Sequence, residues 1–92
     1  MHKILSKRLL ASSVYMFVLE APLVARAAKP GNFVMVRSDE HGERVPLTIV
    51  ENDAEKGTIT IVVQEIGAST MRMCSFEQGQ SFTDVLGPCG TP

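Results

Sequence analysis

The chain has 92 residues, of which 45% are hydrophobic, and a net charge of −1 from nine basic and ten acidic residues. This length predicts one domain, and the apolar fraction argues against disorder. The charge leaves no basic excess for a nucleic-acid backbone, and one Tyr, four Phe and no Trp provide few rings for base stacking. We therefore expect no nucleic-acid partner.

Targeting and metal signals are also missing from the sequence. No apolar run is long enough to span a bilayer, and the basic start M-H-K-I-L-S-K-R is not followed by the apolar core of a signal peptide. Cys74 and Cys89 match no zinc spacing, and His2 and His41 lie far from both. Two unlinked thiols are typical of a cytoplasmic protein, and no metal site is predicted.

The first half of the chain predicts three strands and one helical segment. Strands are expected at residues 3–11, 14–20 and 33–37, and the Ala-rich segment 23–29 favours about two helical turns. The second strand is apolar on both of its faces until Glu20. Such a strand is either covered on both sides or presents one face to another component.

The fourth and fifth strands are predicted as a hairpin. They occupy residues 44–51 and 58–66, joined by the turn N-D-A-E-K-G. Pro46 lies inside the fourth strand, where it cannot donate to a ladder, so the strand must be at an edge, bulged or turned toward a ligand. In the fifth strand Ile59, Ile61 and Val63 share one face.

A short helix is predicted after the hairpin, with Ser69 or Thr70 as its N-cap. A sixth strand follows at residues 81–86, and residues 87–92 have the composition of a linker. Six short strands with this one intervening helix predict an all-β fold, a small closed antiparallel barrel.

Arg44, Pro46 and Thr48 form the first candidate binding motif. Alternate residues of a strand face the same way, so Arg44 and Thr48 are expected on one face, roughly 13 Å apart. This distance suits a diphosphate and the reactive centre of a flavin ring, with Arg on phosphate, Thr on a ring nitrogen, and Pro46 and Leu47 as apolar surface. On residue types alone, an exposed Arg, an edge Pro and a β-favouring Thr remain the alternative.

The segment from Gly67 to Thr70 is the second half of this motif. Gly at a strand end allows close approach of a ligand, and the following helix start offers free N–H groups and the hydroxyls of Ser69 and Thr70. An ordinary turn with an N-cap is the alternative. Both halves belong to successive strands of one hairpin, which favours a joint site. No Ser/His/Asp or Cys/His set indicates a catalytic centre.

Four stretches carry a family resemblance when taken together. They are P-G-N-F-V-M-V-R (30–37), G-E-R-V-P-L-T-I (42–49), E-K-G-T-I-T-I-V-V-Q-E-I-G-A-S-T (55–70) and D-V-L-G-P-C-G (84–90). In this order they resemble the N-terminal FAD-binding domain of the ferredoxin–NADP reductase-like flavoproteins. The chain is similar in particular to the small subunit of the NADH-dependent ferredoxin–NADP oxidoreductases (sulfide dehydrogenase subunit), and is related to the electron-transfer subunit of dihydroorotate dehydrogenase.

The resemblance implies a six-stranded antiparallel Greek-key barrel with a short helix after strand five, and FAD as cofactor. It implies these FAD-contacting residues: Arg44, Pro46, Leu47, Thr48, Val63, Gln64, Gly67, Ser69 and Thr70. The wider superfamily has Arg three residues before the Ser/Thr and an aromatic between them. Here Arg44 lies four residues before Thr48 and Leu47 replaces the aromatic, a form that the similar branch shares.

The resemblance also implies what lies outside these 92 residues. The NAD(P) site and a [2Fe-2S] cluster belong to other parts of the full protein, and neither Cys74 nor Cys89 is a cluster ligand. We expect residues 1–92 to be an FAD-binding barrel, a fragment of an oxidoreductase that is inactive alone and works with a larger catalytic subunit. As a fragment it is expected to be a homo-oligomer, with FAD weakly held or absent. The alternatives are a dihydroorotate dehydrogenase electron-transfer subunit and a non-catalytic barrel acting as a binding module.

Overall fold

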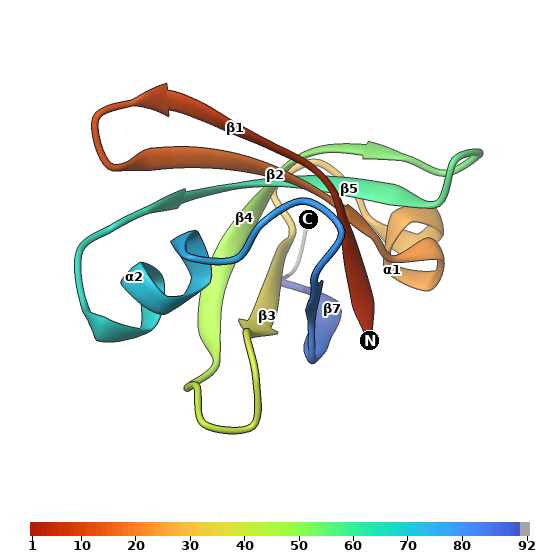
Figure 1. Ribbon diagram of the computed structural model, residues 1–92. Coiled ribbons are helices and arrows are strands. Elements are labelled where there is room, and N and C mark those ends of the chain that lie inside the picture. Colours follow the sequence, from red (N-terminus) through yellow and green to blue (C-terminus); the bar gives the residue numbers. More distant parts are fainter. Residues whose placement is uncertain (91–92) are drawn as a thin grey trace.

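The computed structural model describes residues 1–90, and its architecture is shown in Figure 1. The elements in chain order are β1 His2–Ala11, β2 Val14–Glu20, α1 Pro22–Ala27, β3 Phe33–Arg37, β4 Val45–Asp53, β5 Thr58–Gln64, α2 Ala68–Cys74, β6 Ser81–Phe82 and β7 Asp84–Cys89. Thr91 and Pro92, the end of the predicted linker and of the predicted domain, lie outside the described residues.

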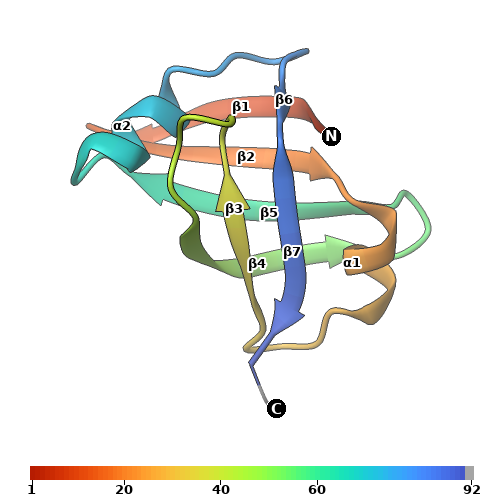
Figure 2. The same ribbon diagram turned by 90° about the horizontal axis from the view of Figure 1, so that it is seen from below.

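The seven strands form one sheet in the order β6-β1-β2-β5-β4-β3-β7, with antiparallel neighbours throughout. Only Thr83 separates β6 from β7 in the chain, so the two outer strands of the sheet are brought together and the barrel is nearly closed. Figure 2 shows β3 and β7 crossing the layer of β1, β2 and β5. The predicted all-β antiparallel barrel is confirmed.

The predicted count of six strands is wrong, because the expected strand 81–86 divides at Thr83. β6 pairs with the start of β1, whereas β7 pairs with β3. The chain must change partners between the two edges of the sheet, and it does so at Thr83, whose N–H donates to Ser38 O at 3.2 Å. β7 then continues to Cys89, into the predicted linker, because β3 remains beside it.

The barrel has two helices, not the single helix of the predicted architecture. The helical turns expected at 23–29 are present as α1, with Pro22 in the first turn and Val24 and Ala25 buried. The N-cap of α2 is Gly67, so the prediction of Ser69 or Thr70 was wrong. Thr70 instead closes the turn before α2, because its Oγ1 accepts the N–H groups of Ile66 and Gly67, each at 3.0 Å.

Alternation along β5 supplies much of the core. Ile59, Ile61 and Val63 are fully buried, as predicted from their common face. Phe17 of β2 and Phe82 of β6 are also fully buried, and their rings meet edge to face with centroids 5.5 Å apart. Such pairs add to the stabilisation from area burial, so β6 is anchored despite its two-residue length.

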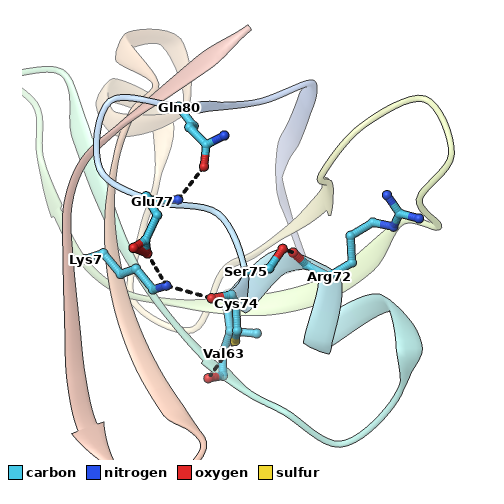
Figure 3. A network of polar contacts seen from close by, with 7 residues as sticks. All are labelled: Lys7, Val63, Arg72, Cys74, Ser75, Glu77 and Gln80. Atoms are coloured by element: carbon cyan, nitrogen blue, oxygen red, sulfur yellow. Dashed lines mark hydrogen bonds and ion pairs between the residues drawn. The ribbon is translucent and has the colours of Figure 1, made fainter.

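Lys7 of β1 fastens the C-terminal end of α2 to the barrel (Figure 3). Its Nζ donates to Cys74 O at 2.7 Å and to Glu77 Oε1 at 2.6 Å. The same ammonium lies 4.7 Å from the centroid of the Tyr15 ring, a cation–π distance. Cys74 Sγ also donates to Val63 O at 3.8 Å, so α2 is held against both β1 and β5.

Candidate functional site

β4 changes its strand partners along its length. Residues 45–48 pair with β3, but the pairing of β4 with β5 begins only at Ile49, opposite Ile61. The register shifts between Ile49 and Glu51, which marks a bulge. β4 and β5 are therefore unpaired toward the start of α2, and Pro46 lies in this unpaired segment.

A groove of about 320 Å³ opens where the two strands separate, and we call it the β4–β5 groove. Its walls combine apolar side chains with three polar ones. They are Val45, Pro46, Leu47, Thr48, Val50, Val62, Gln64, Ile66 and Thr70. Small-molecule sites have this character, with apolar walls, a few polar groups and volumes that begin at about 300 Å³.

The backbone of β4 contributes polar groups to the groove. Ile49 N–H donates to Asn32 O at 3.1 Å, on the β3 side of β4. Successive N–H and C=O pairs of a strand point to opposite edges, so those of Thr48 and Pro46 point toward β5. Because β5 does not pair there, Pro46 omits no ladder bond and its carbonyl faces the groove together with the amide of Thr48.

The backbone of β5 does the same from the opposite side. Glu65 N–H donates to Ser13 O at 2.8 Å, on the β2 side. The same alternation turns the backbone groups of Gln64 and Val62 toward β4 and the groove. The groove thus has apolar walls and a polar rim of main-chain groups, which suits a flat heteroaromatic ring with hydrogen-bonding atoms at its edge.

A second cavity, the loop–helix cavity, adjoins the first and has a volume of about 760 Å³. It is lined by the β3–β4 loop and α2, through His41, Gly42, Glu43, Ala68, Ser69, Met71, Arg72 and Ser75. Arg72 Nη1 lies 2.9 Å from Asp39 Oδ2 and joins the two walls. Desolvation acts to raise the pKa of Asp39, but the His41 N–H bond and the charge of Arg72 outweigh it and lower the pKa below its ordinary value.

The nine predicted site residues do not all reach the same space. Pro46, Leu47, Thr48, Gln64 and Thr70 line the β4–β5 groove, and Ser69 lines the loop–helix cavity. Arg44, Val63 and Gly67 line neither.

Arg44, Val63 and Gly67 lie outside both cavities, each in a different environment. Val63 is fully buried and its side chain faces the core. Gly67 is the exposed N-cap of α2. The Nη2 atom of Arg44 lies 3.3 Å from Asp84 Oδ2 on β7.

Four residues of the groove were missed by the sequence analysis: Val45, Val50, Val62 and Ile66. Val62 shares the outward parity of Gln64, so the alternation of β5 contained the signal. Val50 and Ile66 are 54% and 78% exposed, and no local pattern indicates that a bulge and a strand end bring them together.

Two further findings concern the described residues. Among residues 1–90, no group of three or more His, Cys, Asp or Glu side chains is gathered in a way that could hold a metal ion. In the same range, neither helix is long and apolar enough to cross a membrane.

Comparisons with known proteins match the whole of the described barrel, although no family model matches the chain. A Clostridium beijerinckii protein encoded in the adh 3′ region is 47% identical over 92 residues, which are 100% of this chain and 31% of that protein. A dihydroorotate dehydrogenase B (NAD(+)) electron transfer subunit homolog from Thermotoga maritima is 36% identical over 100% of this chain and 33% of its own. The corresponding subunit of Shouchella clausii is 39% identical over 83 residues, 87% of this chain and 32% of its own.

The structural comparison agrees with these relatives. The chain superposes on the NADH-dependent reduced ferredoxin-NADP oxidoreductase, solved for its flavin-based electron bifurcation, with a TM-score of 0.97 at 36% identity. The match covers 100% of this chain and 33% of that one. The chain thus spans about a third of the length of the relatives it matches.

Fold and sequence together define the structural class of this chain, a barrel of the ferredoxin reductase-like fold. Over its whole length the chain is similar to an electron transfer subunit homolog of dihydroorotate dehydrogenase B and to the NADH-dependent ferredoxin-NADP oxidoreductase, and it covers about a third of each.

Proposed function

We propose that this chain is an FAD-binding barrel, residues 1–92, of an electron-transfer flavoprotein. The β4–β5 groove is the observation that carries the proposal, because it combines apolar walls with a polar rim. A solved structure with the same fold was studied for flavin-based electron bifurcation, which supports a flavin as the ligand. The flavin supplies the electron-transfer chemistry, and the protein supplies binding, orientation and electrostatics.

Each part of the groove has a role in this proposal. Leu47 and Val62 contact the faces of the ring. The Thr48 hydroxyl and the main-chain groups of Thr48 and Gln64 bond to the atoms at the ring edge. Ser69 and the loop–helix cavity accommodate the adenosine part of FAD, while Arg44 meets the phosphates at the end of the β4–β5 groove and Gly67 allows close approach of the backbone.

The full protein, in this proposal, passes electrons between NAD(P)H and an iron–sulfur carrier, and its nicotinamide and [2Fe-2S] sites lie outside residues 1–92. A larger catalytic subunit is its partner, as the name "electron transfer subunit" indicates for the relatives. Cys74 and Cys89 are free thiols, which supports a cytoplasmic setting.

Titration of flavin-free protein with FAD tests the proposal through quenching of flavin fluorescence. The Thr48→Val variant removes the hydroxyl at the groove but keeps the shape of the side chain, and it is expected to weaken binding about five- to ten-fold. Thr58→Val is the matched control, because Thr58 lies at the opposite end of β5 and pairs with Glu20. Absence of FAD binding by the wild-type chain, or equal weakening by both variants, would contradict the proposal.

A further inference from the structure

The guanidinium of Arg44 contacts a residue of β7, a strand on the far side of β3 from the β4–β5 groove. That residue is Asp84, and the strand order β5-β4-β3-β7 puts β3 between Asp84 and β4. The groove lies on the other side of β4, toward β5. The two chain neighbours, Glu43 and Val45, line the two cavities, but Arg44 itself lines neither.

Asp84 has a second and closer partner in Arg37. Arg37 Nε and Nη2 lie 2.9 and 2.8 Å from Asp84 Oδ2, whereas Arg44 Nη2 lies 3.3 Å from the same oxygen. Arg44 is also the most exposed of the three, at 48% against 27% for Arg37 and 25% for Asp84. Arg44 can therefore leave Asp84 without leaving the carboxylate unpaired, and its departure costs little.

The guanidinium of Arg44 cannot contact Asp84 and a ligand in the β4–β5 groove at the same time. Asp84 lies two strand positions from β4, and strand spacing puts these positions roughly 9–10 Å apart. A guanidinium directed toward β7 is thus directed away from any ligand between β4 and β5. The Arg44–Asp84 contact and a contact of Arg44 with a ligand in the groove are alternatives.

We propose that Asp84 is a positioning residue that holds the Arg44 side chain away from the β4–β5 groove. The phosphates of a flavin nucleotide must then replace Asp84 as the ion-pair partner of Arg44 in order to bind. This inference rests on the proposed function. It assigns to Asp84 a part in setting affinity for phosphorylated over unphosphorylated flavins, although Asp84 lines neither cavity.

Asp84→Asn tests the proposal because it removes the charge and preserves the shape. The freed Arg44 should tighten FAD binding about two- to five-fold, the scale of an exposed ion pair. Riboflavin carries no phosphate, so its affinity should not change. Arg44→Gln alone should weaken FAD binding ten-fold or more, since it removes a charge-assisted bond.

A double-mutant cycle separates the contact from the general effect of charge. In the Arg44→Gln background, Asp84→Asn should change FAD affinity by less than about 1.5-fold, because the residue through which it acts is gone. Tightening of the same size in both backgrounds would mean that Asp84 acts by long-range repulsion and would overturn the proposal. Unchanged or weakened FAD binding by Asp84→Asn would overturn it as well.

A measurement on the wild-type chain keeps the test independent of the folding of the variant. The Nε–Hε NMR signal of Arg44 should shift when FAD saturates the protein, and an unshifted signal would overturn the proposal. If the wild-type chain binds neither FAD nor riboflavin, the proposed function fails and this inference fails with it. If FAD binds normally but Asp84→Asn has no effect, only the role of Asp84 fails.

Discussion

Gly67 adopts a conformation that does not require glycine. Its φ of −163° is extended backbone, and a Cβ built on it meets no heavy atom within 4 Å. The chain itself therefore tolerates a side chain here, and glycine has two physical advantages at this position: it is a good N-cap residue, and it allows close approach of a ligand.

Gly67→Val should thus separate binding from folding. The free energy of unfolding should fall by less than about 1 kcal/mol, the cost of a poorer N-cap, as measured by urea denaturation. FAD affinity should fall more than ten-fold, because the new side chain occupies the backbone approach. Wild-type affinity in this variant would remove Gly67 from the site.

The fold protects the thiol of Cys74 from reagents in solution. It is 4% exposed, and burial, with a smaller contribution from the charge of Glu65, raises the pKa of its thiol to about 11. We expect Ellman's reagent at pH 8 to react with Cys89 in the native protein and with Cys74 only after unfolding. Rapid reaction of both thiols without denaturant would contradict this.

The same shift gives stability a pH dependence at alkaline pH. The raised pKa means that the native state keeps the Cys74 proton where the unfolded state has lost it. The free energy of unfolding should therefore decrease as pH rises from the ordinary thiol pKa, about 8.5, to about 11. Cys74→Ala should remove this part of the dependence in urea titrations.

At the scale of elements, the position of α2 depends on Lys7. The Lys7 side chain is only 15% exposed and links β1 to the end of α2 and to Glu77. Lys7→Met keeps the apolar stem but removes the charged donor, so it should lower the free energy of unfolding by about 1–3 kcal/mol. Urea denaturation measures the change.

Glu77 provides the matched control for Lys7. Its side chain is 68% exposed, and Glu77→Gln should cost less than about 1 kcal/mol, as for other surface ion pairs. Because α2 forms a wall of the loop–helix cavity, Lys7→Met should also weaken FAD binding more than Glu77→Gln does. Equal stability of the two variants would show that the hydrogen bond from Lys7 to the Cys74 carbonyl contributes little to the free energy of unfolding.

At the scale of the whole molecule, apolar side chains are exposed on several faces. Val50 and Ile66 flank the β4–β5 groove, and Leu23 and Leu86 lie at a hollow of about 380 Å³ between α1 and β7. Exposed apolar surface of this kind tends to acquire a partner, and two-fold pairing is the commonest arrangement of identical chains.

We therefore predict that residues 1–92 form a dimer or higher oligomer, with FAD weakly held or absent after purification. Light scattering and an absorbance spectrum of the same sample provide the measurement. A monomer that carries one tightly bound FAD would contradict both parts of the prediction.

Much of this architecture follows from local patterns in the sequence. The alternation of β5 predicted its buried face, and the polar turn predicted the β4–β5 hairpin, because side-chain periodicity and turn chemistry act over a few residues. Alternation along the fourth strand likewise predicted that Arg44 and Thr48 would share a face. Of the nine site residues that the family resemblance implied, five line one groove.

Only the tertiary structure decided where strands exchange partners and which distant charges meet. Thr83 divides the last strand because the two edges of the sheet belong to β1 and β3, and no local pattern encodes that exchange. Arg44 meets Asp84, 40 residues away, and Lys7 meets Glu77, 70 residues away. The groove itself exists because β4 leaves β5 at Ile49, and that separation depends on how the whole barrel closes rather than on any single segment.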